Sequence, residues 1–452
     1  MTQSSRAFRS AVVLWVIGLF VTMFPLAGQA GTRQVQITAS DGSARDRLGM
    51  SVAISGDTAI VGSLDDAGAG LHQGAAYVFT QAGETWTEQA KLVASDGAAL
   101  DRFSYNAVAV SGGTALVGSM WDDVGVNPDQ GSAYIFTRSG GTWTQQAKLT
   151  ASDGLPLDNF GFSVALSGDT AVIGAYWDDV GVNPDQGSAY VFTREGGTWT
   201  EQAKLTAPRG VPLQEFGHSV ALSDDTILVG AQGDLVGLNP RQGSAYVFTR
   251  SGSTWTQQAQ LVASDGEATD GAGFAVALSR DTAVVGAYFD DTGDNEDQGS
   301  AYVFNRTGST WAEQVQLTAS DGAANDLYGR AVAIAGRTIL VGAQWDDIDG
   351  KTNQGSAYLL TRSGGTWTEQ AKLTAPDGAA DDLYGTTVAM SGEDGIIGAS
   401  FDDVGSNGDQ GSAYVFGHDR RRGSYHRGIR SHNDRRVISS PRGSATNIKH
   451  FD

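Results

Sequence analysis

Residues 160–205 read FGFSVALSGDTAVIGAYWDDVGVNPDQGSAYVFTREGGTWTEQAKL. Four segments of this stretch are rich in β-branched and aromatic residues and are separated by Gly, Asp and Asn, which is typical of antiparallel strands. The strands that we predict here are 162–167, 171–175, 189–193 and 199–205. Gly168-Asp169 and Gly196-Gly197 are suited to tight hairpin turns. The longer segment 177–187 joins the second strand to the third.

The same pattern recurs seven times along the chain. An Asp-Gly loop, or Arg-Gly in one copy, opens each repeat at steps of 55 to 57 residues, at Asp41, Asp96, Asp153, Arg209, Asp265, Asp321 and Asp377. Four antiparallel strands per copy at such a period are typical of β-propellers. We therefore predict an all-β fold, a seven-bladed β-propeller of four-stranded antiparallel blades, over residues 31–416.

The two ends of the repeat region predict how the ring closes. The seventh copy stops after its third strand, at Phe416, and residues 32–40 align without gaps with residues 144–152, which include a fourth strand. We expect the segment 32–40 to complete blade seven, because an uncovered edge strand invites unwanted pairing. An open solenoid is the alternative, but it would need distinct polar end caps, and the sequence shows none.

The charge of the chain limits its partners. Its 452 residues carry a net charge of −21, but nine Lys/Arg against three Asp/Glu lie in residues 417–452, and Arg6 and Arg9 lie near the start. The remaining part, 31–416, therefore carries about −29. A body this acidic repels nucleic acid and anionic membranes, so we expect no nucleic-acid partner. The chain has no Cys, which excludes disulfides and thiolate metal sites.

The two ends of the chain have their own composition. Residues 1–30 read as a signal peptide, with Arg6 and Arg9 before an apolar run and small residues at 27–30. An uncleaved anchor is the alternative, although the run is slightly short for a span of about 20 residues. We expect a secreted, periplasmic or cell-surface protein with no membrane span after cleavage.

Residues 417–452 match no repeat and are predicted to be a basic, disordered tail. An anchor to anionic polymers and a reading-frame slip are the alternatives.

Several recurring motifs resemble a known family. These are Phe160-Gly161 before the first strand, Ile173-Gly174-Ala175 in the second, Gly-Ser-Ala-Tyr-Val-Phe at 187–192 and Thr-Trp-Thr-Glu-Gln-Ala-Lys-Leu at 198–205. They resemble the FG-GAP repeat family, and most of all its bacterial exported branch. That family is similar to the N-terminal β-propeller of integrin α-chains. The resemblance implies a propeller used for adhesion and ligand binding, often with calcium.

Topology indicates where a ligand would bind. In an up-and-down blade, the loop between the second and third strands emerges on the same side as the connection to the next blade. We call this side the loop face and the opposite side, with its short turns, the hairpin face. The loop face carries the long loops and most acidic residues, and loops on a rigid frame commonly hold binding groups.

Five of these long loops contain an aromatic residue followed by two Asp, and in three of them the aromatic residue is Trp. Aromatic faces beside carboxylates are suited to sugars or cationic groups. The alternative is that each ring packs against the next blade. The ligand-binding residues that we predict are Trp121, Asp122, Asp123, Trp177, Asp178, Asp179, Trp345, Asp346 and Asp347.

Calcium is possible but is not required by this prediction. The resemblance implies a calcium loop between the first two strands of a repeat, yet here that connection is a tight turn in every copy, with no room for six or more oxygen ligands. The richest acidic loop lies elsewhere, between the second and third strands of copy five. Its Asp290, Asp291, Asp294 and Asp297 are the predicted ligands of a weak calcium site. The alternative is that these carboxylates accept backbone hydrogen bonds in turns.

The function that we predict is a monomeric, exported, non-catalytic binding or adhesion propeller with a protein or glycan ligand. Residues 31–416 hold two His, in different loops, and near-identical copies cannot supply differentiated acids and bases. The alternatives are a glycan-acting enzyme on the same scaffold and a purely structural envelope or matrix protein. Copy four departs from the pattern at Arg209, Gln214 and Gly233, through either asymmetric ligand docking or drift of a redundant repeat.

Overall fold

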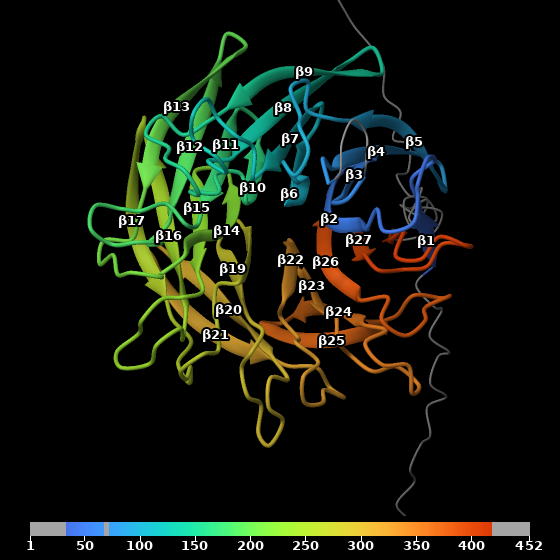
Figure 1. Ribbon diagram of the computed structural model, residues 1–452. Helices are drawn as coiled ribbons and strands as arrows, with labels where there is room; N and C mark the ends of the chain where they lie inside the picture. The colour runs from blue at the N-terminus through green and yellow to red at the C-terminus, as the bar shows by residue number, and fades with distance from the viewer. Residues whose placement is uncertain (1–32, 67–71, 418–452) are drawn as a thin grey trace, which may run out of the picture. The chain divides into compact units, whose positions relative to one another are not determined.

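The protein forms seven four-stranded antiparallel sheets in a ring, as predicted (Figure 1). This computed structural model describes residues 33–66 and 72–417, so the predicted signal peptide and all but the first residue of the predicted tail lie outside the described residues. The described ranges contain no helix long and apolar enough to cross a lipid bilayer.

The two inner strands of each blade are joined by a two-residue turn on the hairpin face. The innermost strands are β2 (Leu48–Ser55), β6 (Phe103–Ser111), β10 (Ser163–Ser167), β14 (Phe216–Ser223), β18 (Ala275–Ser279), β22 (Ala331–Ala335) and β26 (Tyr384–Ser391). Their partners are β3 (Thr58–Ser63), β7 (Thr114–Ser119), β11 (Thr170–Ala175), β15 (Thr226–Ala231), β19 (Thr282–Ala287), β23 (Thr338–Ala343) and β27 (Asp394–Ala399).

The two outer strands complete each blade. The third strands are β4 (Ala75–Ala82), β8 (Ser132–Ser139), β12 (Ser188–Glu195), β16 (Ser244–Ser251), β20 (Ser300–Thr307), β24 (Ser356–Ser363) and β28 (Ser412–Phe416). The outermost strands are β5 (Thr85–Leu92), β9 (Thr142–Leu149), β13 (Thr198–Leu205), β17 (Thr254–Leu261), β21 (Thr310–Leu317), β25 (Thr366–Leu373) and β1 (Gln34–Ile37).

The N-terminal strand closes the ring. β1 pairs antiparallel with β28, from Gln34 opposite Phe416 to Ile37 opposite Ala413, so the predicted completion of blade seven is confirmed. β1 is shorter than the other outermost strands and lacks their Trp. As a consequence Leu359, on the face of blade six that meets blade seven, is partly exposed, whereas its counterpart Val191 is fully buried.

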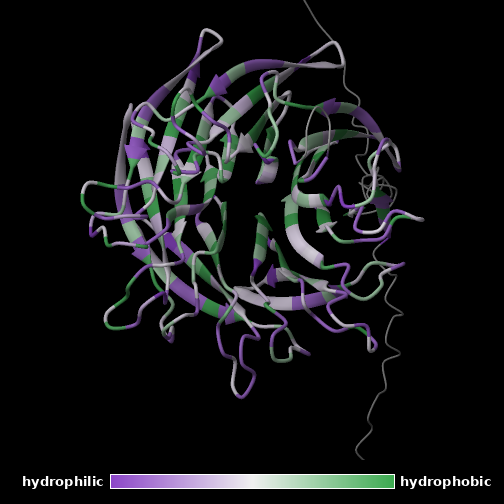
Figure 2. Ribbon diagram, viewed as in Figure 1, coloured by the Kyte–Doolittle hydropathy of each residue, from purple (hydrophilic) through white to green (hydrophobic). Residues whose placement is uncertain are grey.

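The apolar core lies between neighbouring blades. One cluster joins Ile135 and Leu149 of blade two to Ile173 and Phe192 of blade three. An equivalent cluster joins β1 and blade seven to blade one. In Figure 2 the inner strands are coloured as more hydrophobic and the outermost strands as more hydrophilic. Each blade is therefore held by both neighbours, and burying this surface drives ring formation.

Glycine permits the close approach of one blade to the next. Gly161 of the Phe-Gly motif has a φ of +95°, and a Cβ at this position would lie 2.2 Å from the backbone oxygen of Ser132 in blade two. Gly131 has a φ of +83°, and its Cβ would lie 2.0 Å from the backbone oxygen of Phe160. Phe160-Gly161 and Gln130-Gly131 thus form the two sides of one contact between blades.

Candidate functional site

The long loops of the loop face are clamped to the following blade. The Asn183 side-chain amide donates hydrogen bonds to Gln186 Oε1 at 2.9 Å and to the Gly210 carbonyl at 3.0 Å. The backbone N–H of Leu213 donates to the carbonyl of Pro184 at 2.9 Å. The side-chain clamp recurs at Asn127, Asn239, Asn295 and Asn407. In blades two to five and seven the loop face is consequently a set of fixed loops, which lowers the entropy cost of binding a ligand there.

The first Asp of each predicted Asp-Asp pair lies inside this framework. Asp178 accepts hydrogen bonds from Ser188 Oγ and from Tyr190 OH, and pairs with Lys204 Nζ at 2.7 Å. Asp122 pairs with Lys148 and Asp346 with Lys372, both at 2.6 Å. All three carboxylates are buried. Their contacts join the long loop to the third and fourth strands of the same blade.

The second Asp of each pair closes its own loop. Asp123 Oδ1 accepts a hydrogen bond from the backbone N–H of Asp129 at 3.0 Å. Asp179 and Asp347 make the same contact, with the N–H groups of residues 185 and 353. These three carboxylates are exposed, so a ligand can reach them.

The predicted aromatic residues differ in their surroundings. Trp177 is 40% exposed and Trp345 is 41% exposed. Trp121 is partly buried, because the Arg102 guanidinium lies 3.7 Å from its ring centroid and its Nε1 donates to Asn159 Oδ1 at 3.1 Å. The structure therefore presents Trp177 with Asp179, and Trp345 with Asp347, at the surface. Ligand binding by these residues stays a prediction.

The four predicted calcium ligands of blade five are used in different ways. Asp290 is buried and accepts hydrogen bonds from Ser300 Oγ and Tyr302 OH, and burial raises its pKa. Asp291 accepts the backbone N–H of Asp297 at 2.9 Å. Within the described residues no three His, Cys, Asp or Glu side chains are grouped as a metal site would need. Calcium binding by Asp290, Asp291, Asp294 and Asp297 stays a prediction.

A further recurring carboxyl, between the blades, has a perturbed pKa. Asp158 is 2% exposed and accepts the backbone N–H of Leu155 at 2.6 Å. Burial, with a contribution from the charge of Asp178, raises the pKa of Asp158 to about 7. Asp153, in the same connection, behaves oppositely. Although burial raises its pKa, the ion pair with Lys204 and the hydrogen bond from Tyr190 hold it below its ordinary value.

An arc of neighbouring, mutually tilted rings, which the sequence interpretation missed, follows the loop-face ends of the inner strands of blades two to five. Neighbouring ring centroids along it are 4.2 to 6.4 Å apart, and the members are Tyr105, Phe162, Tyr176, His218, Phe274 and Tyr288. We call these six residues the aromatic arc. Burial lowers the pKa of His218 to about 4, so its ring is neutral at pH 7 and donates Nδ1–H to the Phe274 carbonyl at 3.1 Å. Arg330 ends the arc, 5.0 Å above the Phe274 ring.

The sequence does carry a signal for the arc. The residue after the Phe-Gly motif, or its equivalent, differs between copies although the motif around it recurs. It is Met50, Phe162, His218, Phe274, Arg330 and Thr386 in copies one and three to seven, and copy two has an additional residue at this point, with Tyr105 in the arc. A position that varies beside a recurring turn is one at which the framework does not determine the side chain.

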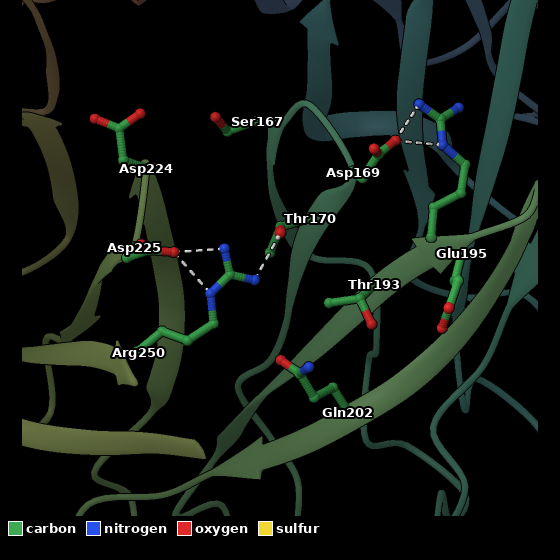
Figure 3. A pocket seen from close by; sticks show the side chains of 10 residues that line it. Ser167, Asp169, Thr170, Thr193, Glu195, Gln202, Asp224, Asp225 and Arg250 are labelled. Carbon is green, nitrogen blue, oxygen red and sulfur yellow. Dashed lines mark hydrogen bonds and ion pairs between the residues drawn. The ribbon is translucent and has the colours of Figure 1, made fainter. Parts of the chain in front are cut away.

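A groove of about 580 Å³ lies on the hairpin face between blades three and four (Figure 3). Arg250 crosses it, pairing with Asp225 at 2.5 Å and donating to Thr170 Oγ1 of blade three at 3.2 Å. Arg194 pairs with Asp169 at 2.5 Å. Equivalent Arg-to-Thr contacts join other blades, for instance at Arg138. The groove is thus lined by contacts that fasten one blade to the next.

Comparison with known proteins agrees with this architecture. The FG-GAP repeat model matches the chain seven times, over residues 32–79, 86–136, 143–192, 199–248, 255–304, 311–360 and 367–416. Each later match begins in the outermost strand of one blade and ends in the third strand of the next, as the clasped ring requires. No curated protein matches the chain. The chain belongs to the FG-GAP repeat family.

Proposed function

We propose that the protein is an exported, non-catalytic binding or adhesion propeller that holds a protein or glycan ligand on its loop face. A binding or structural role accords with an FG-GAP propeller. One observation carries the choice of face. On the loop face, repeated polar residues such as Asn183, Gln186 and Asp178 are used to hold loops together, whereas the exposed residue at the loop tip differs between blades, as at Val182, Asp294 and Ser406. A fixed frame with variable exposed positions is suited to recognition.

Two exposed pairs favour a glycan as one form of this ligand. Trp177 and the exposed Asp179 are two residues apart in one loop, and Trp345 and the exposed Asp347 have the same spacing in another. A ring face supplies apolar contact to a sugar, and a carboxylate oxygen accepts its hydroxyl hydrogen bonds. These pairs lie in blades three and six, so a ligand that contacts both must span the ring.

The absence of Cys from the chain allows a direct test of the proposed face. The purified protein is screened against glycans and soluble proteins, and any bound glycan is also assayed for cleavage, which would support the enzyme alternative. Two variants, Ser406→Cys on the loop face and Ser253→Cys on the hairpin face, are then labelled with a maleimide polyethylene glycol. Both serines are exposed. We expect the loop-face label to weaken binding and the hairpin-face label to leave it unchanged. The reverse pattern would refute the proposal.

A further inference from the structure

Exposed apolar side chains are concentrated on the loop face of blades two to four. Val126, Val182 and Leu238 occupy the same position at the tips of three successive long loops and are 93%, 95% and 95% exposed. Leu100, Leu157 and Leu213 occupy one shared position in three successive connections between blades, and each is more than half exposed. We call these six residues the apolar sector.

Backbone hydrogen bonds hold two of these connections against the neighbouring loop tips. The backbone N–H of Leu157 donates to the carbonyl of Pro128, two residues after Val126, at 3.0 Å. Leu213 makes the same contact with the loop that carries Val182, at 2.9 Å. The loop tips therefore alternate with the connections between blades along one edge of the loop face. An exposed apolar surface of this kind is typical of a contact with another molecule.

The loop tips are rigid, so they cannot fold inward to hide these side chains. Val180 and Asn183 exchange two backbone hydrogen bonds of 3.2 Å across the tip that carries Val182. The side chain of Asn183 then fixes this tip to the next blade. The exposure of Val182 is consequently a property of the folded framework.

The three leucines also carry a conformational cost. Leu100, Leu157 and Leu213 have φ values of 76°, 72° and 60°, in the left-handed region. A bulky side chain is disfavoured there, by about 1 kcal/mol or more, relative to Gly, Asn or Asp. Exposure to water adds a second cost, which these leucines could recover by burial against a partner.

The same positions in other blades show that the framework does not require apolar residues. At the loop tips, blades five to seven have Asp294, Gly350 and Ser406. In the connections that enter blades five to seven, the left-handed position is occupied by Thr269, Asn325 and Asp381. Blades with polar residues at both positions keep the same strands and the same loop contacts.

We propose that the apolar sector is the docking surface for a separate protein whose contact surface is apolar and flanked by Lys or Arg. The charge of the chain indicates the flanking residues, because residues 31–416 carry about −29 and the exposed Asp123 and Asp179 border the sector. The same charge opposes pairing of two copies through this face. This inference rests on the proposed function, since it names the partner class for one part of the loop face.

Synthetic peptides serve as probes, with fluorescence anisotropy as the readout. Three peptides of equal length are compared: one alternating Leu with Lys, one alternating Leu with Glu, and one alternating Ser with Lys. We expect the full-length protein to prefer the Leu-Lys peptide by about tenfold or more over each of the others. Binding should weaken as salt is added, because part of it is electrostatic.

The variant Val126→Ser/Val182→Ser/Leu238→Ser tests the location. It introduces at three tips the neutral residue that blade seven has at position 406, and we expect it to weaken Leu-Lys peptide binding by about tenfold. Ser406→Ala changes the same loop position outside the sector and should leave binding unchanged. Thermal melting checks that both variants fold.

Three outcomes would overturn the inference. The triple variant could bind the Leu-Lys peptide like the wild type, or the Leu-Glu peptide could bind equally well. The wild type could also dimerise in sedimentation while the triple variant stays monomeric, which would make the sector a contact between copies. If the triple variant binds normally but the loop-face label still blocks a screened ligand, the loop face stands and only the sector assignment fails.

Discussion

The buried carboxyl of Asp158 should limit stability at neutral pH, and its replacement by Asn should remove that limit. Asp158 lies between blades two and three and is 2% exposed. Blade four already has a neutral amide at this position, because Gln214 stands there and is fully buried. Gln214 Nε2 donates to Asp234 Oδ1 at 3.0 Å, in place of the repulsion between two carboxylates. Asp158→Asn therefore places a neutral amide in blade three, where blade four already has the amide of Gln214.

The sign and size of the effect follow from the pKa of Asp158. Burial raises this pKa from 3.8 to about 7 in the folded protein, while the unfolded chain keeps the ordinary value. The folded state thus binds the proton more tightly, so stability is fully present below about pH 4 and falls as the pH rises through about 7. At ~1.4 kcal/mol per pKa unit, this difference in pKa corresponds to at most about 4 kcal/mol of the free energy of unfolding. Because the new amide hydrogens also need acceptors, we expect a net gain of about 1–2 kcal/mol at pH 8.

Urea denaturation at pH 8 and pH 4 measures this gain. The melting temperature at pH 8 should rise by about 1–3 °C. Asp153→Asn is the matched control with the opposite sign. The contacts of Asp153 with Lys204 and Tyr190 hold its pKa low despite burial, so its contribution is present at neutral pH and is lost as the pH falls through the folded pKa. This control should lose stability at pH 8 and should approach the wild type in acid.

Two results would refute the reasoning about Asp158. If the Asn variant is no more stable than the wild type at pH 8, the carboxyl does not carry an uncompensated charge. If the same gain persists at pH 4, the effect comes from packing or hydrogen bonding and is unrelated to ionisation.

Three other predictions concern the frame and the metal. Gly161→Ala should cost about 3 kcal/mol or more in urea denaturation, because its Cβ would meet a backbone oxygen of blade two, whereas Gly168→Ala, with nothing within 4 Å, should cost about 1 kcal/mol or less. Ile37→Ala, in the buried part of β1, should cost about 2–4 kcal/mol, and an unchanged unfolding midpoint would show that the clasp does not stabilise the ring. If blade five binds calcium, millimolar calcium should raise the melting temperature, and Asp294→Asn/Asp297→Asn should abolish the rise.

Much of the architecture was predictable because it repeats. Strand segments such as 199–205 are flanked by turn residues that have little choice of conformation, and the structure places this strand at Thr198–Leu205. The alignment of residues 32–40 with an outermost strand predicted the clasp, since a strand of this type needs a third strand as its partner. These inferences use local pattern and the order of the copies, and neither depends on knowing which side chains meet.

The site was less predictable because it depends on contacts between distant residues. Asp178 and Asp179 are adjacent and chemically identical, yet one is buried against Tyr190 and Lys204 while the other is exposed. Sequence alone could not separate their roles, because Tyr190 and Lys204, the partners of Asp178, lie on two other strands. The aromatic arc is also tertiary, since Phe162, His218 and Phe274 are brought together only when three blades stand side by side.

The sequence by itself thus determined the number of blades, the order of their strands and the strand that closes the ring, because periodic local preferences encode them. The tertiary structure decided which members of each recurring loop hold the frame and which face solvent. Burial and hydrogen bonding depend on neighbours that the chain supplies from other strands and from adjacent blades, and the repeat pattern does not encode them.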